Sequence, residues 1–197
     1  MIIVGLTGGM GMGKSTAAGV FRRAGIPVFD ADAAVHRLQA RGGRAVPRIR
    51  AAFPDCVREG AVDRGCLRRA VLDRPESLGI LEQILHPMVR REEVAFLARA
   101  RRGGHRIAVL DIPLLLETGG DRRVDRIVVV SAPAAVQRRR VAGRRRMTAA
   151  EADAMIRHQM PDAEKRRRAD IVIRTGLSRH HALRAVNRFI KELRDAP

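Results

Sequence analysis

The chain of 197 residues is long enough for one domain that carries a small insertion. Its 46% of apolar residues excludes global disorder. No apolar run approaches the roughly 18 residues of a membrane span, and the N-terminus lacks the basic segment of a signal peptide. We therefore expect a cytoplasmic globular protein without a membrane partner.

The net charge of +18 could reflect nucleic acid, an acidic membrane surface or anionic small molecules as partners. The basic residues are spread along the whole chain, and the aromatic residues are five Phe, with no Trp or Tyr. Side chains on which single-stranded bases could stack are therefore scarce. The composition favours phosphate-rich small molecules over nucleic acid.

Short apolar runs predict the strands of a parallel sheet, with helical stretches between them. These runs are residues 1–6, 26–29, 107–110, 126–130 and 171–173. Apolar runs without polar alternation are typical of strands buried on both faces, and strands that alternate with helices indicate βαβ units. We predict a three-layer α/β fold with a five-stranded parallel sheet. A last helix is expected from near Ser178, with one apolar stripe formed by Leu183, Val186, Ile190 and Leu193.

The interval 33–104 is too long for one crossover helix, so it predicts an inserted helical subdomain. One helix is expected over 63–72 and a longer one over 78–97. Proline removes a backbone donor and disfavours helix at the residue before it, so a break or kink is expected at Pro87. A break would allow His86 to face a ligand, whereas a histidine beside an apolar face is more often structural.

The two cysteines, Cys56 and Cys66, have no third or fourth partner and do not form a CxxC pair. This spacing fits neither a redox motif nor a zinc site. In a reducing cytoplasm we expect two free thiols.

A phosphate-binding motif lies between the first strand and the helix that follows it. Residues 8–15 read GGMGMGKS, a complete GxxxxGKS pattern. Its glycines allow backbone N–H groups to point inward around an anion, and the helix N-terminus adds its positive dipole end. Lys14 is expected to reach the β- and γ-phosphates of ATP, and the Ser15 hydroxyl to ligate Mg²⁺. The alternative, a flexible glycine turn, does not account for the strand and helix on either side, so we predict the P-loop NTPase fold class.

Acidic residues follow two of the predicted strands, at the edge of a doubly wound sheet where ligands bind. Asp30 and Asp32 follow the second strand, and Asp32 is the candidate general base for a hydroxyl acceptor. Either carboxylate could instead cap the helix that starts near Ala33. Asp111 follows the third strand and could contribute to the Mg²⁺ site or cap a short helix.

Basic residues gather on the helix after the fourth strand. Gln137, Arg140 and Arg144 fall on one face of that helix. An arginine-rich turn at 144–147 and a further helix follow, which predicts a lid over about 138–150 that closes over phosphates. A solvated basic face is the alternative.

Taken together, these residues resemble the dephospho-CoA kinase family from end to end. The matching motifs are LTGGMGMGKST (6–16), DAD (30–32), LHP (85–87), PLLLE (113–117), Gln137 with Arg140 and Arg144, Gln159, and ADIVI (169–173). The first three in combination are specific to this family. The resemblance implies ATP-dependent phosphorylation of the ribose 3′-hydroxyl of dephospho-CoA to coenzyme A, with ADP as the other product and Mg²⁺ as the metal.

The resemblance also implies roles for individual residues. Asp32 becomes the expected catalytic base, with Lys14 as the second catalytic residue, and the insertion 33–104 becomes the acceptor-binding domain. The dephospho-CoA contacts are expected at Asp32, His86, Pro113 and Leu114. The nucleotide contacts are expected at Gly9, Gly11, Met12, Gly13, Lys14, Ser15, Thr16 and the lid residues Arg140 and Arg144.

Two positions depart from the family pattern. Met12 stands where a small residue such as Ser is usual, and because the cradle is built from backbone we expect its side chain to point away with little effect. The family usually has Asn shortly after the last strand, where this chain has Arg174-Thr175-Gly176. The contact made by that Asn is therefore not carried over to this chain.

Overall fold

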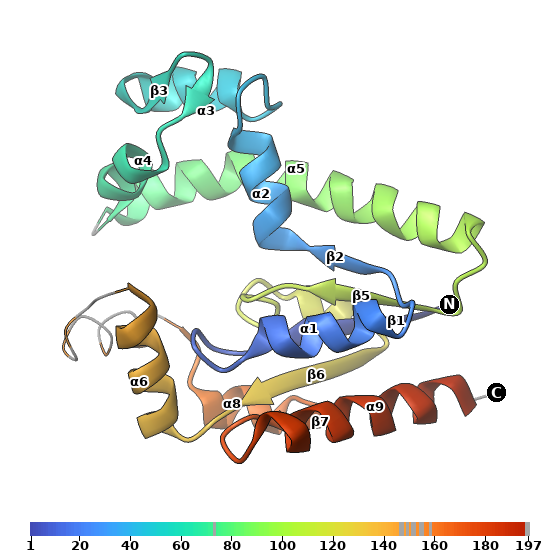
Figure 1. The fold of residues 1–197 in the computed structure, drawn as a ribbon. Coiled ribbons are helices and arrows are strands. Elements are labelled where there is room, and N and C mark those ends of the chain that lie inside the picture. Colours follow the sequence, from blue (N-terminus) through green and yellow to red (C-terminus); the bar gives the residue numbers. More distant parts are fainter. Residues whose placement is uncertain are drawn as a thin grey trace. The chain divides into compact units, whose positions relative to one another are not determined.

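The computed structural model describes residues 1–72, 74–145, 148, 150, 153, 156–157 and 159–195; the side chains of 144, 145 and 179 lie outside this description. The chain forms two compact units. Unit 1 comprises Met1–Phe29 and Arg99–Pro197, and unit 2 comprises Asp30–Ala98 (Figure 1). Within the described ranges, every helix is too short or too polar to cross a membrane.

A five-stranded sheet forms the centre of unit 1, in the order β2-β5-β1-β6-β7. Its strands are β1 (Ile2–Thr7), β2 (Val28–Asp30), β5 (Ile107–Asp111), β6 (Arg126–Ser131) and β7 (Ile171–Arg174). Strand β1 pairs in parallel with β5 and β6, and β6 pairs in parallel with β7. All five predicted strands and the parallel α/β sheet are confirmed.

The sheet is buried on both faces, as its unbroken apolar runs predicted. On one face, Val4 and Leu6 of β1 belong to a core that also contains buried residues of α1 (Lys14–Arg23) and α9 (Arg179–Asp195). The rings of Phe21 and Phe189 join these two helices at a centroid distance of 6.5 Å. On the opposite face, a Cβ added at Gly5 would meet Leu115 at 2.5 Å, so a larger residue at position 5 would displace that leucine.

The remaining elements of unit 1 are η2 (Gly120–Arg123), α6 (Ala134–Arg145) and α8 (Asp162–Arg167). The last helix, α9, begins where predicted and buries Val186, Ile190 and Leu193, while Leu183 is partly buried. Figure 1 shows α1 and α9 running along the sheet, with α6 beyond the end of β6. The connections after β1, β5, β6 and β7 all leave the sheet at its carboxyl edge because the strands are parallel.

Unit 2 has a core of its own, which includes Leu38, Ile49, Leu67 and Leu85. Its elements are α2 (Ala31–Gln39), α3 (Val46–Ala52), η1 (Pro54–Cys56), β3 (Val57–Arg58), β4 (Ala61–Val62), α4 (Arg64–Val71) and most of α5 (Pro75–Arg102). The β3–β4 hairpin was not predicted, because strands of two residues carry no periodic signal. The one local indication of its turn is Gly60. Both Gly60 and the preceding Glu59 have positive φ.

Helix α5 runs without interruption through Pro87, so the predicted break is absent. Proline removes one hydrogen bond of the helix ladder, that of its own N–H. The helix spans 28 residues, and its neighbouring turns pack Leu81, Leu85 and Val89 into the core of unit 2. Tertiary packing therefore outweighs the local cost of the proline. His86 lies on this helix with an exposed side chain.

The two cysteines form a disulfide, so the prediction of free thiols is wrong. Their sulfur atoms are 2.10 Å apart and their Cα atoms 5.3 Å apart. Cys56 ends η1 and Cys66 lies in the first turn of α4. The β3–β4 hairpin folds the chain back between them and brings the two elements together. The pairing depends on this hairpin, which sequence spacing alone did not reveal.

Candidate active site

The phosphate loop connects β1 to α1 in unit 1, and its glycines are required by the backbone. A Cβ at Gly8 would meet the carbonyl oxygen of Val130 at 2.5 Å, and Gly13 caps α1 with φ of 94°. Some backbone N–H groups of the loop and the first helical turn find no acceptor in the described part of the chain: those of Gly11, Gly13, Lys14 and Ser15. Such a set of unpaired donors at a helix N-terminus is suited to bind phosphate.

The carbonyl groups of the same loop are held from outside by three side chains. Gln137 Nε2 donates to the carbonyl of Met10 at 2.9 Å, and Arg140 donates to that of Gly11 at 3.4 Å. The Thr175 hydroxyl donates to the carbonyl of Met12 at 2.5 Å. A further side chain, Gln159, accepts the N–H of Met10 at 2.8 Å. These bonds fix the loop conformation while leaving its other N–H groups available to a ligand.

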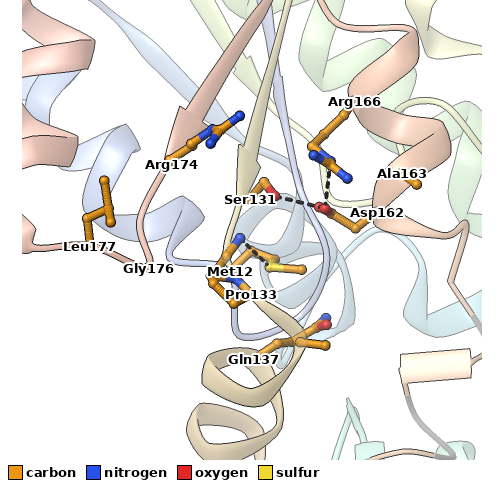
Figure 2. A pocket seen from close by; sticks show the side chains of 12 residues that line it. Met12, Ser131, Pro133, Gln137, Asp162, Ala163, Arg166, Arg174, Gly176 and Leu177 are labelled. Atoms are coloured by element: carbon orange, nitrogen blue, oxygen red, sulfur yellow. Dashed lines mark hydrogen bonds and ion pairs between the residues drawn. The ribbon is translucent and has the colours of Figure 1, made fainter.

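The Met12 side chain points into the protein, as expected. It is 2% exposed, and its sulfur accepts the N–H of Ala132 at 3.0 Å. Met12 also lines a cavity of about 450 Å³ between the ends of β6 and β7. Figure 2 shows that Ser131 and Arg166 both point toward Asp162 at this cavity. The Asp162 carboxylate accepts a hydrogen bond from Ser131 at 2.8 Å and pairs with Arg166 at 3.0 Å.

Lys14 forms an ion pair with Asp111 at 2.5 Å. The Asp111 side chain is only 4% exposed and that of Lys14 17%, so the pair is largely desolvated. Asp111 ends β5, the strand next to β1, which places its carboxylate at the phosphate loop. A buried carboxylate of this kind holds a nearby cation in place until a stronger anion arrives.

The Pro113–Glu117 segment is anchored by a buried lysine. Lys165 has a side chain that is 1% exposed, and its ammonium pairs with Glu117 at 2.7 Å and donates to the carbonyl of Pro113 at 3.3 Å. The same carbonyl accepts the Thr7 hydroxyl at 2.8 Å. Pro113 is thus fixed beside the start of the phosphate loop, and the adjoining Leu114 is 40% exposed.

The predicted lid begins with α6, on which Arg140 binds protein groups. Its guanidinium donates to the carbonyl of Thr175 at 2.8 Å and to the Thr175 hydroxyl at 3.1 Å, besides its bond to Gly11. Arg138 pairs with Asp153 at 2.6 Å. The side chain of Arg144 and most of the remaining lid lie outside the described residues.

In unit 2, the acidic pair after β2 divides its roles. Asp30 caps α2, because its carboxylate accepts the N–H of Ala33 at 2.9 Å. Asp32 lies in the first turn of α2, is exposed and makes no side-chain hydrogen bond or ion pair within the described ranges. The capping alternative is therefore settled in favour of Asp30, and Asp32 is left for another role.

The sequence did not predict the roles that three anchoring residues have in the structure. Asp111 was weighed for the metal or a helix cap but not as the partner of Lys14, Thr175 was noted only as a departure, and Lys165 was not singled out. A lysine at 0% residue exposure carries no local sequence signal. The one hint of this buried lysine in the sequence was Glu117, the acidic residue of the PLLLE motif.

The sheet is parallel and has a backbone phosphate cradle at its carboxyl edge. A lysine is held at this cradle by an acidic residue of the neighbouring strand. These features define the class of P-loop kinases. Comparison with known proteins narrows the class. A sequence model of the dephospho-CoA kinase family matches residues 2–179, and the chain belongs to this family. It is accordingly a phosphotransferase.

Individual relatives agree with this assignment over the full length. The dephospho-CoA kinase of Gluconobacter oxydans is 51% identical over 200 residues, covering 100% of both chains. That of Brucella abortus is 50% identical over 197 residues, covering 100% of this chain and 98% of the relative. Among solved structures, a Thermus thermophilus protein superposes with a TM-score of 0.85 at 37% identity, over 97% of this chain and 96% of the other. A Campylobacter jejuni dephospho-CoA kinase, at 20% identity and a TM-score of 0.66 over 97% of this chain and 96% of the other, shares the fold.

Proposed function

We propose that the chain transfers the γ-phosphoryl group of ATP to the ribose 3′-hydroxyl of dephospho-CoA, giving coenzyme A and ADP in the cytoplasm. The observation that carries the nucleotide half is the set of unpaired loop N–H groups with Lys14 beside them. Family membership over residues 2–179 supports the acceptor half. The cytoplasmic location rests on the sequence prediction.

Binding of ATP would exchange one partner of Lys14 for another. The loop N–H groups bind the phosphate oxygens, and the ammonium of Lys14 turns from Asp111 toward the β- and γ-phosphates. Because the loop carbonyls are already held by Gln137, Arg140 and Thr175, little reorganisation is needed. Catalysis would then come from positioning and from fixed charge around the transferring group.

Oxygen donors suited to Mg²⁺ are present on both sides of the loop. Ser15 exposes its hydroxyl in the first turn of α1, and Asp111 supplies a carboxylate at the end of β5. Hard oxygen ligands of this kind fit Mg²⁺, which keeps several waters and binds through few protein groups. When bound, Mg²⁺ would neutralise charge on the phosphates.

Asp32 is proposed as the general base for the acceptor hydroxyl. It would take the proton of the 3′-hydroxyl as that oxygen bonds to the γ-phosphorus and the bond to the β-phosphate oxygen breaks, releasing ADP. Support comes from its exposed carboxylate, which makes no hydrogen bond or ion pair within the described residues, and from the fact that Asp30 is the residue that caps α2. We further propose acceptor contacts at His86, Pro113 and Leu114, with the insertion 33–104 as the acceptor-binding domain.

Phosphate contacts from the lid are proposed for Arg140 and Arg144. Arg140 would have to release Thr175 to reach a nucleotide, or else act by holding the loop. Closure of the lid would exclude water and so limit hydrolysis of ATP.

The test is an assay of ADP release with ATP and Mg²⁺ that compares dephospho-CoA with adenosine, AMP and no acceptor. We expect only dephospho-CoA to accelerate ADP release. Asp32→Asn should lower kcat by about 10²–10⁴-fold, the usual contribution of a general base. Asp55→Asn, which removes another exposed carboxylate of unit 2, is the matched control and should keep full activity.

The circular dichroism spectrum and melting temperature of each variant establish that it is folded. If another acceptor alone stimulates turnover, the P-loop kinase class stands and the acceptor assignment is wrong. If Asp32→Asn behaves like Asp55→Asn, Asp32 is not the base.

A further inference from the structure

A groove of about 720 Å³ lies entirely within unit 2, away from the phosphate loop in sequence. It runs between the end of α2, the helix α4 and the start of α5. Leu67, which is 3% exposed, and Leu81 form apolar parts of its lining. The polar part consists of Gln39 and the three arginines Arg64, Arg68 and Arg69.

Two of the three arginines of this groove are unpaired within the described residues. Arg64 and Arg68 are exposed and form no ion pair or hydrogen bond with any described residue. Arg69 interacts with Asp63, whose pKa is held below its usual range first by the N–H of Cys66 and, to a smaller extent, by the charges of Arg58 and Arg69. Elsewhere in unit 2, by contrast, Arg37 and Arg44 both pair with Glu92.

Free arginines on a helix often form only a solvated basic face, and charge alone would not distinguish a site from such a face. Gln39 supplies the second, independent observation. This glutamine is 7% exposed, lines the groove, and its amide makes no hydrogen bond within the described residues. The polar atoms of this amide are not among the fully buried unpaired ones, so the amide is open to the groove. There it can donate, beside the free guanidinium groups of Arg64 and Arg68, to a ligand that accepts hydrogen bonds.

We propose that this groove binds the diphosphate of the acceptor substrate. Guanidinium groups match phosphate oxygens in a bidentate geometry, and a diphosphate carries enough oxygens to engage more than one arginine and the Gln39 amide together. The apolar lining contributed by Leu67 and Leu81 suits the uncharged chain attached to such a diphosphate. This assignment rests on the proposed function, because dephospho-CoA contains a diphosphate between its nucleoside and its pantetheine arm.

The first experiment measures ligand binding at each arginine and does not depend on enzyme activity. The full-length protein is modified with phenylglyoxal, and the labelled arginines are quantified by peptide mass spectrometry. Inorganic pyrophosphate, inorganic phosphate or dephospho-CoA is added at constant ionic strength. We expect pyrophosphate and dephospho-CoA to protect Arg64, Arg68 and Arg69 several-fold, and to leave Arg50, an exposed arginine of α3, unprotected.

Residue-level detection separates this groove from the phosphate loop, which also binds pyrophosphate. Protection by pyrophosphate but not by dephospho-CoA would overturn the assignment to the acceptor and leave a site for free phosphate. Equal labelling of the three arginines and Arg50 with every probe would overturn the site itself. Failure of the proposed function is a different result: wild-type protein would then not release ADP on addition of dephospho-CoA, whatever the labelling pattern.

The second experiment uses variants. The double variant Arg64→Gln/Arg68→Gln should raise KM for dephospho-CoA by about tenfold or more, because each removes a hydrogen bond to a charged group. KM for ATP should be unchanged. Gln39→Leu, which keeps the side-chain size and removes the amide, should raise KM for dephospho-CoA by about threefold or more and leave the melting temperature equal or higher.

Arg48→Gln/Arg50→Gln removes the same two charges from unit 2 outside the groove and is the matched control for long-range electrostatics. An equal change in KM for dephospho-CoA in this control and in Arg64→Gln/Arg68→Gln would contradict a specific site. Parallel increases in KM for ATP and for dephospho-CoA would also contradict it, since a groove for the acceptor discriminates between the two substrates.

Discussion

At the scale of single residues, Thr175 connects the phosphate loop to the lid helix. Its hydroxyl donates to the carbonyl of Met12 and accepts from Arg140, so it joins the phosphate loop to the lid helix. Its side chain is also buried, with a residue exposure of 8%. Thr175 is therefore a candidate positioning residue for the loop.

We predict that Thr175→Val raises KM for ATP by about three- to tenfold, because one hydrogen bond that fixes the loop is lost and the carbonyl of Met12 is left unpaired. KM for dephospho-CoA should change little. Steady-state kinetics with each substrate varied in turn measure both constants. Thr175→Ser, which restores the hydroxyl, should recover the wild-type KM for ATP; failure of this rescue would assign the effect to packing.

At the scale of elements, the disulfide joins η1 to α4 in unit 2. It closes a short loop around the β3–β4 hairpin, whose strands have two residues each. A two-stranded hairpin of this size is marginal by itself in water. The cross-link and the cap that Asp63 forms on α4 therefore hold this part of unit 2 together.

Reduction of the disulfide is predicted to lower the free energy of unfolding by about 2–3 kcal/mol, the loop-entropy value for a closed loop of this length. Urea unfolding followed by circular dichroism, with and without dithiothreitol, measures the difference. The double variant Cys56→Ala/Cys66→Ala should unfold at the same urea concentration under both conditions. Two readily titratable thiols in the protein before addition of reductant would contradict the pairing.

At the scale of the whole molecule, the net charge of +18 coexists with a site for small anionic substrates. Some arginines of the described surface pair with carboxylates, as Arg168 does with Asp121, and others are free of described partners, as Arg64 and Arg68 are in the groove of unit 2. Such a surface attracts polyanions without selecting among them. The phosphate contacts proposed for the loop, in contrast, come from backbone N–H groups and one lysine.

Nucleic acid is therefore predicted to bind weakly, with an affinity that falls steeply as salt rises, and to leave phosphotransfer unchanged. Fluorescence anisotropy of a labelled oligonucleotide over a salt series measures the first effect, and ADP release with and without RNA or DNA at physiological salt measures the second. Stimulation of ATP turnover by nucleic acid would instead support a nucleic-acid-dependent NTPase.

Comparison of the predicted and observed elements shows where local pattern is sufficient. The five strands and the helix from Arg179 were predicted because each carries a continuous apolar run or stripe. The break predicted at Pro87 is absent. Proline costs the helix one local hydrogen bond, and the packing of Leu85 and its neighbours on α5 into the core of unit 2 outweighs that cost. The hairpin of unit 2 was not predicted, because its short strands show no alternation of apolar and polar residues. The Cys56–Cys66 pairing was missed with it.

The sequence by itself determined the parallel α/β sheet, the phosphate loop after its first strand and the kinase family, since these depend on neighbouring residues within a strand, a turn or a motif. Only the tertiary structure decided which side chains hold that loop. Lys14 meets Asp111 from 97 positions away, and Thr175 reaches Met12 from 163 positions away. It also placed Gln39, which has no hydrogen-bond partner among the described side chains and backbone groups, beside three arginines of another helix. Contacts of this kind arise when distant elements pack on a common core, and no local pattern in the chain encodes them.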